Sequence, residues 1–398
     1  MANPLPAPAF TDRAPAVDRR RPWNAVLVAL FVAVIWLPLA ANIAGSDGAD
    51  PEAENRELAP FPQFDGTLGS IATFGTRLAD WFSDHFGFRS TLVRWYGESR
   101  LFALGVSPTT SVVKGRDGWF FYADDNSLED YARQDPLTPD AIANWRAALV
   151  RAREWLHARG IAYVFTIAPD KYAIYPEEIP ASLVRIGEVS RTDQVYTGLR
   201  GTVVAAVDVR PALLRAKLRE RIYHKTDTHW NDRGALVAYQ QIIAAVRKQV
   251  SSTPPAWTRA DFEAVTRDTH GLDLAGMMGL TRVLRETDYA LVPKRARRAI
   301  VTDPPGAEPI AEEGRLVTEI PGSNLPRAVI FRDSFVSRLV PFLSEHFSRA
   351  AYLWQNDFDS TIIEQEHPDI VIQEIVGRHL YGFIPSPELV PDAETERP

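Results

Sequence analysis

The sequence predicts an α/β fold in which a parallel sheet is covered by helices and preceded by one N-terminal transmembrane helix. An uncharged apolar stretch lies near the N-terminus. From residue 138 onward, short apolar runs rich in Val, Ile and Phe alternate with stretches of helical periodicity. Most of these runs have no polar face, which is typical of strands that are buried on both sides in a parallel sheet.

Composition and charge exclude several classes of function. The chain of 398 residues is long enough for one large domain or two smaller ones, each with a sizeable core. A net charge of −7 argues against nucleic-acid binding, because phosphate contacts need a clustered basic surface. Because the chain has no cysteine, disulfides, thiolate metal sites and cysteine nucleophiles are excluded.

The apolar segment 23–45 is long enough to cross a membrane, since about 20 helical residues span a hydrocarbon core of about 30 Å. Arg19 to Arg21 precede it, and the flank that follows is acidic. Positive flanks stay inside, so residues 1–22 are predicted to be a disordered cytoplasmic tail and the rest of the chain to be exported. A cleaved signal peptide is the alternative, although this apolar run exceeds the usual signal core.

Residues 46–110 are predicted to be an exported linker followed by a helical segment, and residues 111–398 to form the main domain. Within the main domain, residues 111–122 indicate two short strands around the turn residues Asp117 and Gly118. The helix-and-strand alternation is lost at about 252–325, which we interpret as an irregular insertion. The helix within segment 46–110 is indicated by four apolar residues that recur at helical spacing: Ile71, Phe74, Leu78 and Phe82.

Five apolar runs of the main domain are predicted strands, and a short helix is predicted between the last two. Helix boundaries are indicated by a cap followed by a first-turn proline at Thr138 and Pro139, by Gly160 as a stop, and by a polar start at Asn231 and Asp232. The predicted strands are 161–167, 202–209, 327–331, 350–354 and 369–376.

Ser334 is a candidate nucleophile because it lies where the strand 327–331 gives way to a predicted helix. That turn is at the carboxyl end of the sheet, where open α/β folds bind ligands. The backbone N–H of Ser334, at the start of the helix, could face an oxyanion. The alternative is that Ser334 or Asp333 only caps the helix, which is the commoner role of such residues.

The segment "KTDTHWNDRGA" supplies a candidate base and acid. A serine hydroxyl needs a base to take its proton, and histidine titrates in the right range. In extended chain Asp227 and His229 point the same way, so Asp227 could fix the tautomer of His229. Asp227 could instead be a cap and His229 a surface histidine. A metal site with His224 as an extra ligand is a third interpretation, although no HExxH-like cluster is present.

Six segments resemble, in the same order, the alginate O-acetyltransferase family of the AlgJ and AlgX type: "ENRELAPFP", "DHFGFRSTL", "VVKGRDGWFFY", "PDKYAIYPEEIP", "TDTHWNDRGA" and "FRDSFVSRLVPFL". The resemblance covers about residues 52–385 and implies an SGNH-hydrolase-like domain with rearranged strand order. It implies that Asp227 is the acid, His229 the base and Ser334 the nucleophile of a catalytic triad, with no metal and no cofactor. Arg332 departs from the pattern, because a glycine often precedes the Asp-Ser pair in SGNH enzymes.

The resemblance also implies a function. Ser334 would carry an acetyl ester and pass the acetyl group to hydroxyls of an exported polysaccharide, alginate-like or another. Acetyl-CoA is absent outside the cytoplasm, so a membrane-bound O-acyltransferase (MBOAT) partner would donate the acetyl group. The protein is expected in the inner membrane as a single-pass AlgJ type, without the carbohydrate-binding module of the AlgX type, and with its catalytic domain in the periplasm. A carbohydrate acetylesterase and a non-catalytic module that binds a polysaccharide or a synthase are the alternatives.

Four further residues are candidates for substrate binding. Lys171 and Tyr175 follow the strand 161–167, so they are expected near the site; Lys171 could bind an acidic sugar or hold the loop. Trp230 could stack on a sugar ring or pack against the next helix. Arg378 follows the last predicted strand and could meet a carboxylate or remain solvated.

Overall fold

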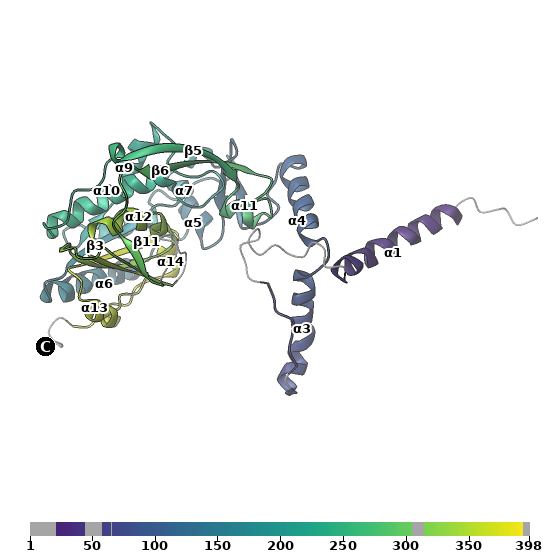
Figure 1. The fold of residues 1–398 in the computed structure, drawn as a ribbon, viewed down its shortest axis with the longest axis horizontal. Helices are drawn as coiled ribbons and strands as arrows, with labels where there is room; N and C mark the ends of the chain where they lie inside the picture. The colour runs from purple at the N-terminus through teal and green to yellow at the C-terminus, as the bar shows by residue number, and fades with distance from the viewer. Residues whose placement is uncertain (1–20, 44–57, 65, 305–313, 393–398) are drawn as a thin grey trace, which may run out of the picture. The chain divides into compact units, whose positions relative to one another are not determined.

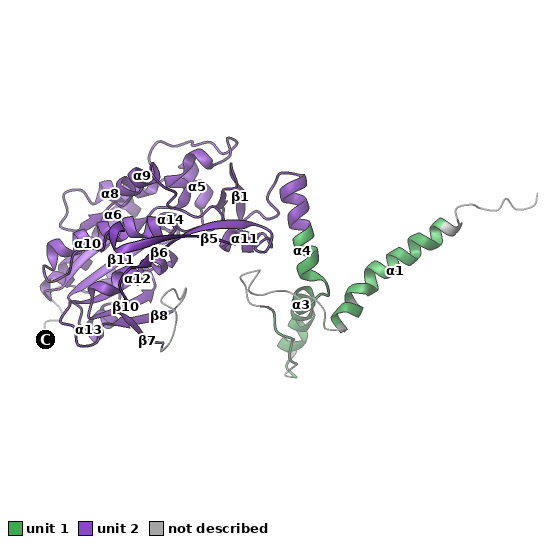
Figure 2. Ribbon diagram, turned by 45° about the horizontal axis from the view of Figure 1, so that its top comes forward, with its two compact units in different colours: residues 1–52, 56–95 green, residues 53–55, 96–398 purple. Residues whose placement is uncertain are grey.

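The computed structural model describes residues 21–43, 58–64, 66–304 and 314–392 (Figure 1). The predicted tail lies almost wholly outside the described residues, as do the acidic part of the linker and residues 305–313 of the predicted insertion. The chain divides into two compact units (Figure 2): Met1–Glu52 with Arg56–Trp95, and Ala53–Asn55 with Tyr96–Pro398.

The first unit is helical. It holds α1 (Arg21–Ile43), α3 (Leu68–Asp84) and most of α4 (Arg89–Glu98). Within α1, the 20 residues Trp23–Asn42 have a mean hydropathy of 2.3, so by length and composition this helix could cross a membrane, as predicted. A signal sequence would meet the same criteria. The helix predicted around Ile71 is confirmed as α3, which Thr67 caps by accepting a hydrogen bond from the N–H of Ser70.

The second unit is built on a seven-stranded sheet with the order β4-β3-β11-β9-β10-β8-β7. The neighbours from β4 to β10 pair in parallel, whereas β8 pairs antiparallel with both β10 and β7. The predicted parallel sheet is therefore confirmed, and β7 and β8 extend it. The strands are β3 (Ala162–Ala168), β4 (Ala205–Val207), β7 (Ile300–Asp303), β8 (Arg315–Glu319), β9 (Arg327–Arg332), β10 (Arg349–Trp354) and β11 (Ile370–Val376).

One predicted strand is wrong in extent. The run 202–209 was expected to be buried on both sides, but β4 has only three residues and all are half-buried. Since β4 is at the edge of the sheet, only one side of it pairs with another strand. An apolar run thus overstated both the length and the burial of this strand.

Helices cover both faces of the sheet (Figure 1). Val164 and Ile330 belong to a core cluster that α10 (Asp232–Gln249) completes with Leu236 and Ile242. The alternate residue Phe165 belongs to a second cluster, which α6 (Pro139–Ala158) and α13 (Ser360–Glu366) complete. Because successive strand residues point to opposite faces, two apolar faces require helices on both sides of the sheet.

The predicted helix boundaries are confirmed by their caps. Thr138 accepts a hydrogen bond from Ala141 N–H, and Pro139 is the first residue of α6. Gly160, with a φ of 74°, follows the end of that helix in the left-handed region that glycine tolerates best. Asn231 caps α10 by accepting hydrogen bonds from the N–H groups of Arg233 and Gly234.

The predicted pair of short strands is also confirmed. β1 (Val112–Lys114) and β2 (Phe120–Tyr122) are antiparallel, with Val113 opposite Phe121. The turn between them contains Asp117 and Gly118, whose φ angles of 47° and 80° suit turn residues.

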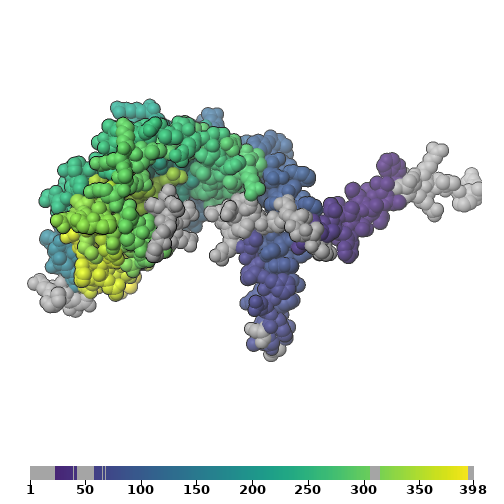
Figure 3. Space-filling view, viewed as in Figure 1, coloured from purple at the N-terminus to yellow at the C-terminus, as the bar shows by residue number. Residues whose placement is uncertain are grey.

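The described residues of segment 252–325 include regular strands and helices, which corrects the expectation of an irregular insertion. The segment contains the antiparallel ribbon of β5 (Phe262–His270) and β6 (Arg285–Pro293), the short helix α11 (Asp273–Met277), and the strands β7 and β8. β5 is mostly exposed and carries few apolar residues, so it lacks the hydrophobic pattern that marks a core strand. The ribbon lies on the surface of the second unit (green in Figure 3).

The remaining helical segments are short. They are η1 (Ser99–Ala103, a π-helix), α5 (Ser127–Ala132), α7 (Lys171–Ile174), α8 (Arg191–Gly198), α9 (Arg210–Lys217), α12 (Val340–Leu343), α14 (His379–Gly382), and the 3₁₀ helices η2 (Pro176–Glu178), η3 (Arg259–Asp261), η4 (Ser334–Arg338), η5 (Ser344–His346) and η6 (Pro387–Leu389).

Candidate active site

Asp227, His229 and Ser334 meet at the carboxyl end of β9. Asp227 Oδ1 lies 2.7 Å from His229 Nδ1, and His229 Nε2 lies 2.8 Å from Ser334 Oγ. Asp227 can only accept, so Nδ1 carries the proton and Nε2 is left to accept from the serine hydroxyl. The structure thus brings together three predicted residues in the order acid, imidazole, hydroxyl, across 105 positions of sequence between His229 and Ser334.

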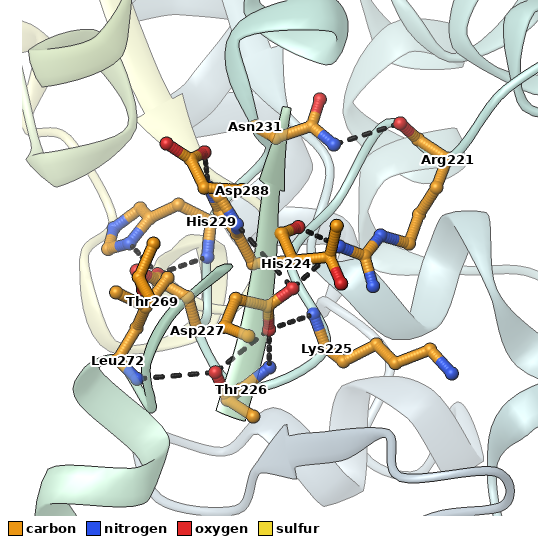
Figure 4. Close-up of polar contacts among 12 residues, drawn as sticks. Arg221, His224, Lys225, Thr226, Asp227, His229, Asn231, Thr269, Leu272 and Asp288 are labelled. Atoms are coloured by element: carbon orange, nitrogen blue, oxygen red, sulfur yellow. Dashed lines mark hydrogen bonds and ion pairs between the residues drawn. The ribbon is translucent and has the colours of Figure 1, made fainter. Parts of the chain in front are cut away.

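The turn that carries the acid and the imidazole is held by its own side chains. Asp227 Oδ1 also accepts from the backbone N–H of His229 at 2.9 Å, so the acid closes the turn that it belongs to. Tyr223 and Trp230 form an isolated β-bridge that closes the base of the loop. Asn231 adds a bond from its side-chain amide to the carbonyl of Arg221 at 2.8 Å (Figure 4).

Lys171 holds this loop from the interior. Its Nζ donates to the carbonyls of His224 at 3.1 Å, Lys225 at 3.1 Å and Asp227 at 2.6 Å, and the residue is only 3% exposed. All three ammonium donors are therefore engaged, and the geometry supports loop holding instead of binding of an acidic sugar. Burial lowers the pKa of Lys171 to about 7, against the raising effect of Asp273, Asp227 and Glu286.

The ribbon segment supplies two residues that sequence reasoning missed. Glu286 of β6 accepts from the backbone N–H groups of Lys225 at 3.0 Å and Thr226 at 2.8 Å, and pairs with Arg221 at 2.6 Å. Asp273 of α11 accepts from the backbone N–H of Thr228 at 2.8 Å. No sequence motif indicates either residue, because each contacts a turn that is more than 40 residues away along the chain.

The charges around the imidazole favour its cationic form. Burial alone would lower the pKa of His229, but the charge and hydrogen bonds of Asp227, together with the charge of Asp273, outweigh burial and raise it. Burial would raise the pKa of Asp227, but His229 holds it well below its usual range. The proton between them therefore belongs to the imidazole.

One group of side chains in the described part of the chain has the spacing for a cation. Ligand atoms of Asp227, His229 and Asp273 lie within 4.8 Å of one another. The same atoms already make direct hydrogen bonds, Asp227 with His229 and Asp273 with Thr228. His224, the extra ligand of the metal interpretation, lies 3.9 Å from the carboxylates of Glu286 and Asp288. Burial lowers the pKa of His224 to about 3, so it is neutral.

Ser334 is the first residue of the 3₁₀ helix η4, and Asp333 is its cap. Asp333 accepts from the N–H groups of Phe335 at 2.9 Å and Val376 at 2.6 Å, which joins the ends of β9 and β11. The capping interpretation therefore applies to Asp333, which leaves the Ser334 hydroxyl to His229. The predicted regular helix is wrong: η4 is followed by the short α12, where Pro341 cannot donate a helical hydrogen bond.

Arg332, the departure from the SGNH pattern, is fully buried. Its guanidinium donates to Ser337 Oγ at 2.9 Å and lies 4.6 Å from the ring centroid of Trp354. Beside it, Glu374 of β11 accepts from the backbone N–H of Asp333 at 3.1 Å. Burial, with the nearby charge of Asp333, raises the pKa of Glu374 well above its usual range, which favours the neutral carboxyl.

Glu374→Gln is expected to keep the rate of acetyl-ester hydrolysis within about twofold, since the side chain of glutamine keeps the acceptor oxygen and is uncharged. A raised carboxyl pKa stabilises the fold at low pH, and this contribution is lost as pH rises through the folded-state pKa. The variant should therefore lose less stability than the unsubstituted protein in thermal unfolding as the pH rises above about 4.3, the ordinary pKa of a glutamate. Glu364→Gln, on a half-exposed glutamate, is the control. Equal losses of stability in all three proteins would contradict a neutral Glu374.

The other three candidates for substrate binding are buried. Tyr175 accepts from Ile222 N–H at 3.0 Å and packs with its ring centroid 4.3 Å from that of Trp119. Trp230, only 1% exposed, donates from Nε1 to the carbonyl of Phe335 at 3.1 Å. The packing alternative thus holds for Trp230, and no face is left for a sugar.

Arg378 meets a carboxylate of its own chain. It pairs with Asp170 at 2.6 Å and is 7% exposed, so the alternative of a solvated arginine is wrong. Its guanidinium carbon lies 5.8 Å from the ring centroid of Phe335, the residue after Ser334. Arg378 therefore lies near the serine but is held by Asp170.

A cavity of about 300 Å³ lies beside this ion pair, at the carboxyl ends of β3, β4 and β11. Its lining includes Asp130, Asp170, Tyr172, Asp208 and Gly377. The residues that line this cavity do not include Asp227, His229 or Ser334.

The model of the SGNH hydrolase-like domain of the acetyltransferase AlgX matches residues 112–351, more than half of the chain. The chain belongs to this family. The match runs from β1 into β10 and includes Asp227, His229 and Ser334. The predicted family and the predicted SGNH-like α/β fold are confirmed.

Similarity to curated relatives is partial. A probable alginate O-acetylase AlgJ of Pseudomonas putida is 33% identical over 142 residues, which is 35% of this chain and 34% of that protein. The corresponding protein of Pseudomonas aeruginosa is 29% identical over 179 residues, 45% of this chain and 39% of that protein. The chain thus spans less than half the length of these relatives.

A solved structure shares the fold. Bacillus cereus PatB1 with a sulfonyl adduct superposes with a TM-score of 0.51 at 15% identity, covering 68% of this chain and 95% of that chain. At this identity the likeness concerns the fold alone.

Proposed function

We propose that this protein is an O-acetyltransferase that moves an acetyl group through an ester on Ser334 onto hydroxyls of an exported polysaccharide. The observation that carries the proposal is the 2.8 Å contact between His229 Nε2 and Ser334 Oγ, completed by Asp227 on the other nitrogen. Membership of the AlgX acetyltransferase family and the names of the AlgJ relatives support it. An alginate-like polymer is the acceptor that those names favour.

In the first half-reaction, His229 takes the proton of Ser334 while Oγ attacks the acetyl carbonyl of the donor. The tetrahedral intermediate collapses when the imidazolium gives its proton to the leaving group, and Ser334 remains acetylated. Asp227 keeps the proton on Nδ1 and stabilises the imidazolium. We assign the backbone N–H of Ser334 as one donor to the oxyanion.

In the second half-reaction, an acceptor hydroxyl takes the place of the leaving group. His229 removes its proton, the sugar oxygen attacks the ester carbonyl, and Ser334 Oγ leaves with the proton from the imidazolium. The cavity beside the Asp170–Arg378 pair is a place where the acceptor chain could extend along the carboxyl edge of the sheet. If water attacked the ester in place of the sugar, the protein would be an esterase. The His229 side chain is 19% exposed, so water has access to the proposed base.

The proposed setting follows from the apolar helix. Segment 23–45 anchors the chain, residues 1–22 stay in the cytoplasm, and residues 46–110 connect the anchor to the catalytic domain 111–398 in the periplasm. An acetyl donor is then needed at the membrane, and an MBOAT protein would supply it. Helix α1 supports the anchor by its length and hydropathy.

The proposal is tested by product analysis. The full-length protein in detergent is incubated with an acetyl-ester donor and candidate glycans, and the glycans are analysed by mass spectrometry. Acetyl groups are expected on the glycan with the unsubstituted protein and with Ser360→Ala, a serine at the start of α13, but not with Ser334→Ala. Free acetate as the sole product would favour the esterase. Equal glycan acetylation by Ser334→Ala would overturn the proposal.

A further inference from the structure

Asp273 contacts the residue between the proposed acid and base. Its Oδ1 accepts from the backbone N–H of Thr228 at 2.8 Å, and its Oδ2 accepts from the Thr228 hydroxyl at 2.5 Å. The adjacent Leu272 donates its N–H to Thr226 Oγ1 at 3.2 Å (Figure 4). The start of α11 is therefore bonded to the turn at two points, which restrains the geometry of Asp227 and His229.

The same carboxylate faces the imidazole. Asp273 Oδ2 lies 3.8 Å from His229 Nδ1, the nitrogen that Asp227 Oδ1 approaches to 2.7 Å. Two carboxylates thus share one side of the ring, while Ser334 is on the other nitrogen. A negative charge at this distance stabilises an imidazolium, although less than the hydrogen-bonded Asp227 does.

The charges that act on Asp273 come from two elements: Asp227 and His229 belong to the turn, and Lys171 belongs to α7. Two further charges act on these neighbours, Glu286 of β6 on Lys171 and Arg378, after β11, on His229. Burial, followed by the charge of Asp227, raises the pKa of Asp273 to about 7; His229, the Thr228 hydroxyl and Lys171 oppose this rise. Asp273 therefore changes its charge in the pH range in which a histidine base acts.

We propose that Asp273 is a positioning residue of the acetyl-transfer site: it holds the Asp227–His229 turn through Thr228 and places a second carboxylate beside His229 Nδ1. This inference rests on the proposed function. When Ser334 gives its proton to Nε2, the imidazolium faces one hydrogen-bonded and one nearby carboxylate. The rate then depends on the ionised fraction of Asp273 as well as on neutral His229.

The test is the titration of His229 in the full-length protein in detergent. The chain has 8 histidines, and the ring labelled with ¹³C is assigned by its loss in His229→Gln. Asp273→Asn keeps an acceptor for Thr228 N–H but removes the charge, so the pKa of His229 should fall by about one unit. The acid limb of kcat/KM for acetyl-ester hydrolysis should move to lower pH, and the plateau should fall roughly tenfold.

A second variant is expected to shift the acid limb of the pH profile in the opposite direction. In Asp273→Asn the acid limb reports the titration of His229 alone, whereas in Thr228→Val the rate still needs ionised Asp273. Thr228→Val removes the hydroxyl that favours ionised Asp273, so Asp273 should stay protonated to higher pH and the acid limb should move upward. Asp268→Asn, on an exposed carboxylate of β5, is the matched control and should leave both limbs in place. Thermal unfolding of each variant shows whether it is folded.

Three results would overturn the inference. One is an unchanged His229 titration in folded Asp273→Asn, and another is a lower rate with an unmoved acid limb, since a merely structural role predicts that pattern. The third is loss of activity with a chelator and recovery with a divalent metal, which would make Asp273 a ligand. The imidazole titration does not require acetyl transfer, so its outcome stands even if Ser334→Ala retains activity and the proposed function fails.

Discussion

Ser334→Ala is expected to lower acetyl-ester hydrolysis by at least about 10³-fold, because the hydroxyl that we propose as the carrier of the acetyl group is lost. His229→Ala should cost a similar factor, and the double variant should be little worse than either single one, since the two groups act as one unit. The measurement is the initial rate of a chromogenic acetyl ester with the full-length protein. A sulfonyl fluoride should label Ser334 only while His229 is present, as read from the modified peptide by mass spectrometry.

The matched control is Ser360→Ala, which should keep both the rate and the labelling. Ser334→Ala removes only the hydroxyl oxygen that His229 contacts at 2.8 Å, so the thermal midpoint of the variant should stay close to that of the parent protein. Strict additivity of the two single losses would argue that His229 does not act through Ser334. Labelling at another serine would place the nucleophile elsewhere.

Lys171→Met is expected to cost about 3 kcal/mol or more in the free energy of unfolding, because three carbonyls in the interior lose their donor. Methionine fills a similar volume but donates nothing. For a domain of this kind the thermal midpoint should fall by roughly 6–12 °C. Hydrolysis should fall as well, since one of the freed carbonyls belongs to Asp227.

Lys248→Met, on an exposed lysine in the last turn of α10, is the control and should change stability by no more than about 0.5 kcal/mol. Differential scanning fluorimetry measures both variants, with reporter hydrolysis on the same samples. A stable and fully active Lys171→Met protein would show that the turn keeps its form without the buried ammonium. That outcome would favour the alternative that Lys171 binds substrate.

The sequence was informative wherever burial acts on a continuous segment. β3, β9 and β11 lie inside the sheet, so nearly every position in them is apolar and the strands could be predicted as unbroken runs. β5 is exposed along most of its length, and its polar residues carry no such pattern. The sequence therefore did not predict the ribbon. It also did not predict the roles of Glu286, which belongs to β6 of the ribbon, and Asp273, which belongs to α11 between its two strands.

The sequence by itself determined the α/β class, the apolar N-terminal helix, the helix caps, and the three residues Asp227, His229 and Ser334, since each depends on local pattern or on short motifs. The tertiary structure decided which polar residues lie around those three. Lys171, which was predicted beside the site, is buried and donates hydrogen bonds to backbone carbonyls of the turn. Trp230 is buried and packs against Phe335. Asp273 reached the imidazole only through the fold of the ribbon. The physical reason is that a buried charge or hydrogen bond depends on partners that are distant in sequence, whereas caps, apolar runs and the Asp227–His229 turn are encoded by neighbours.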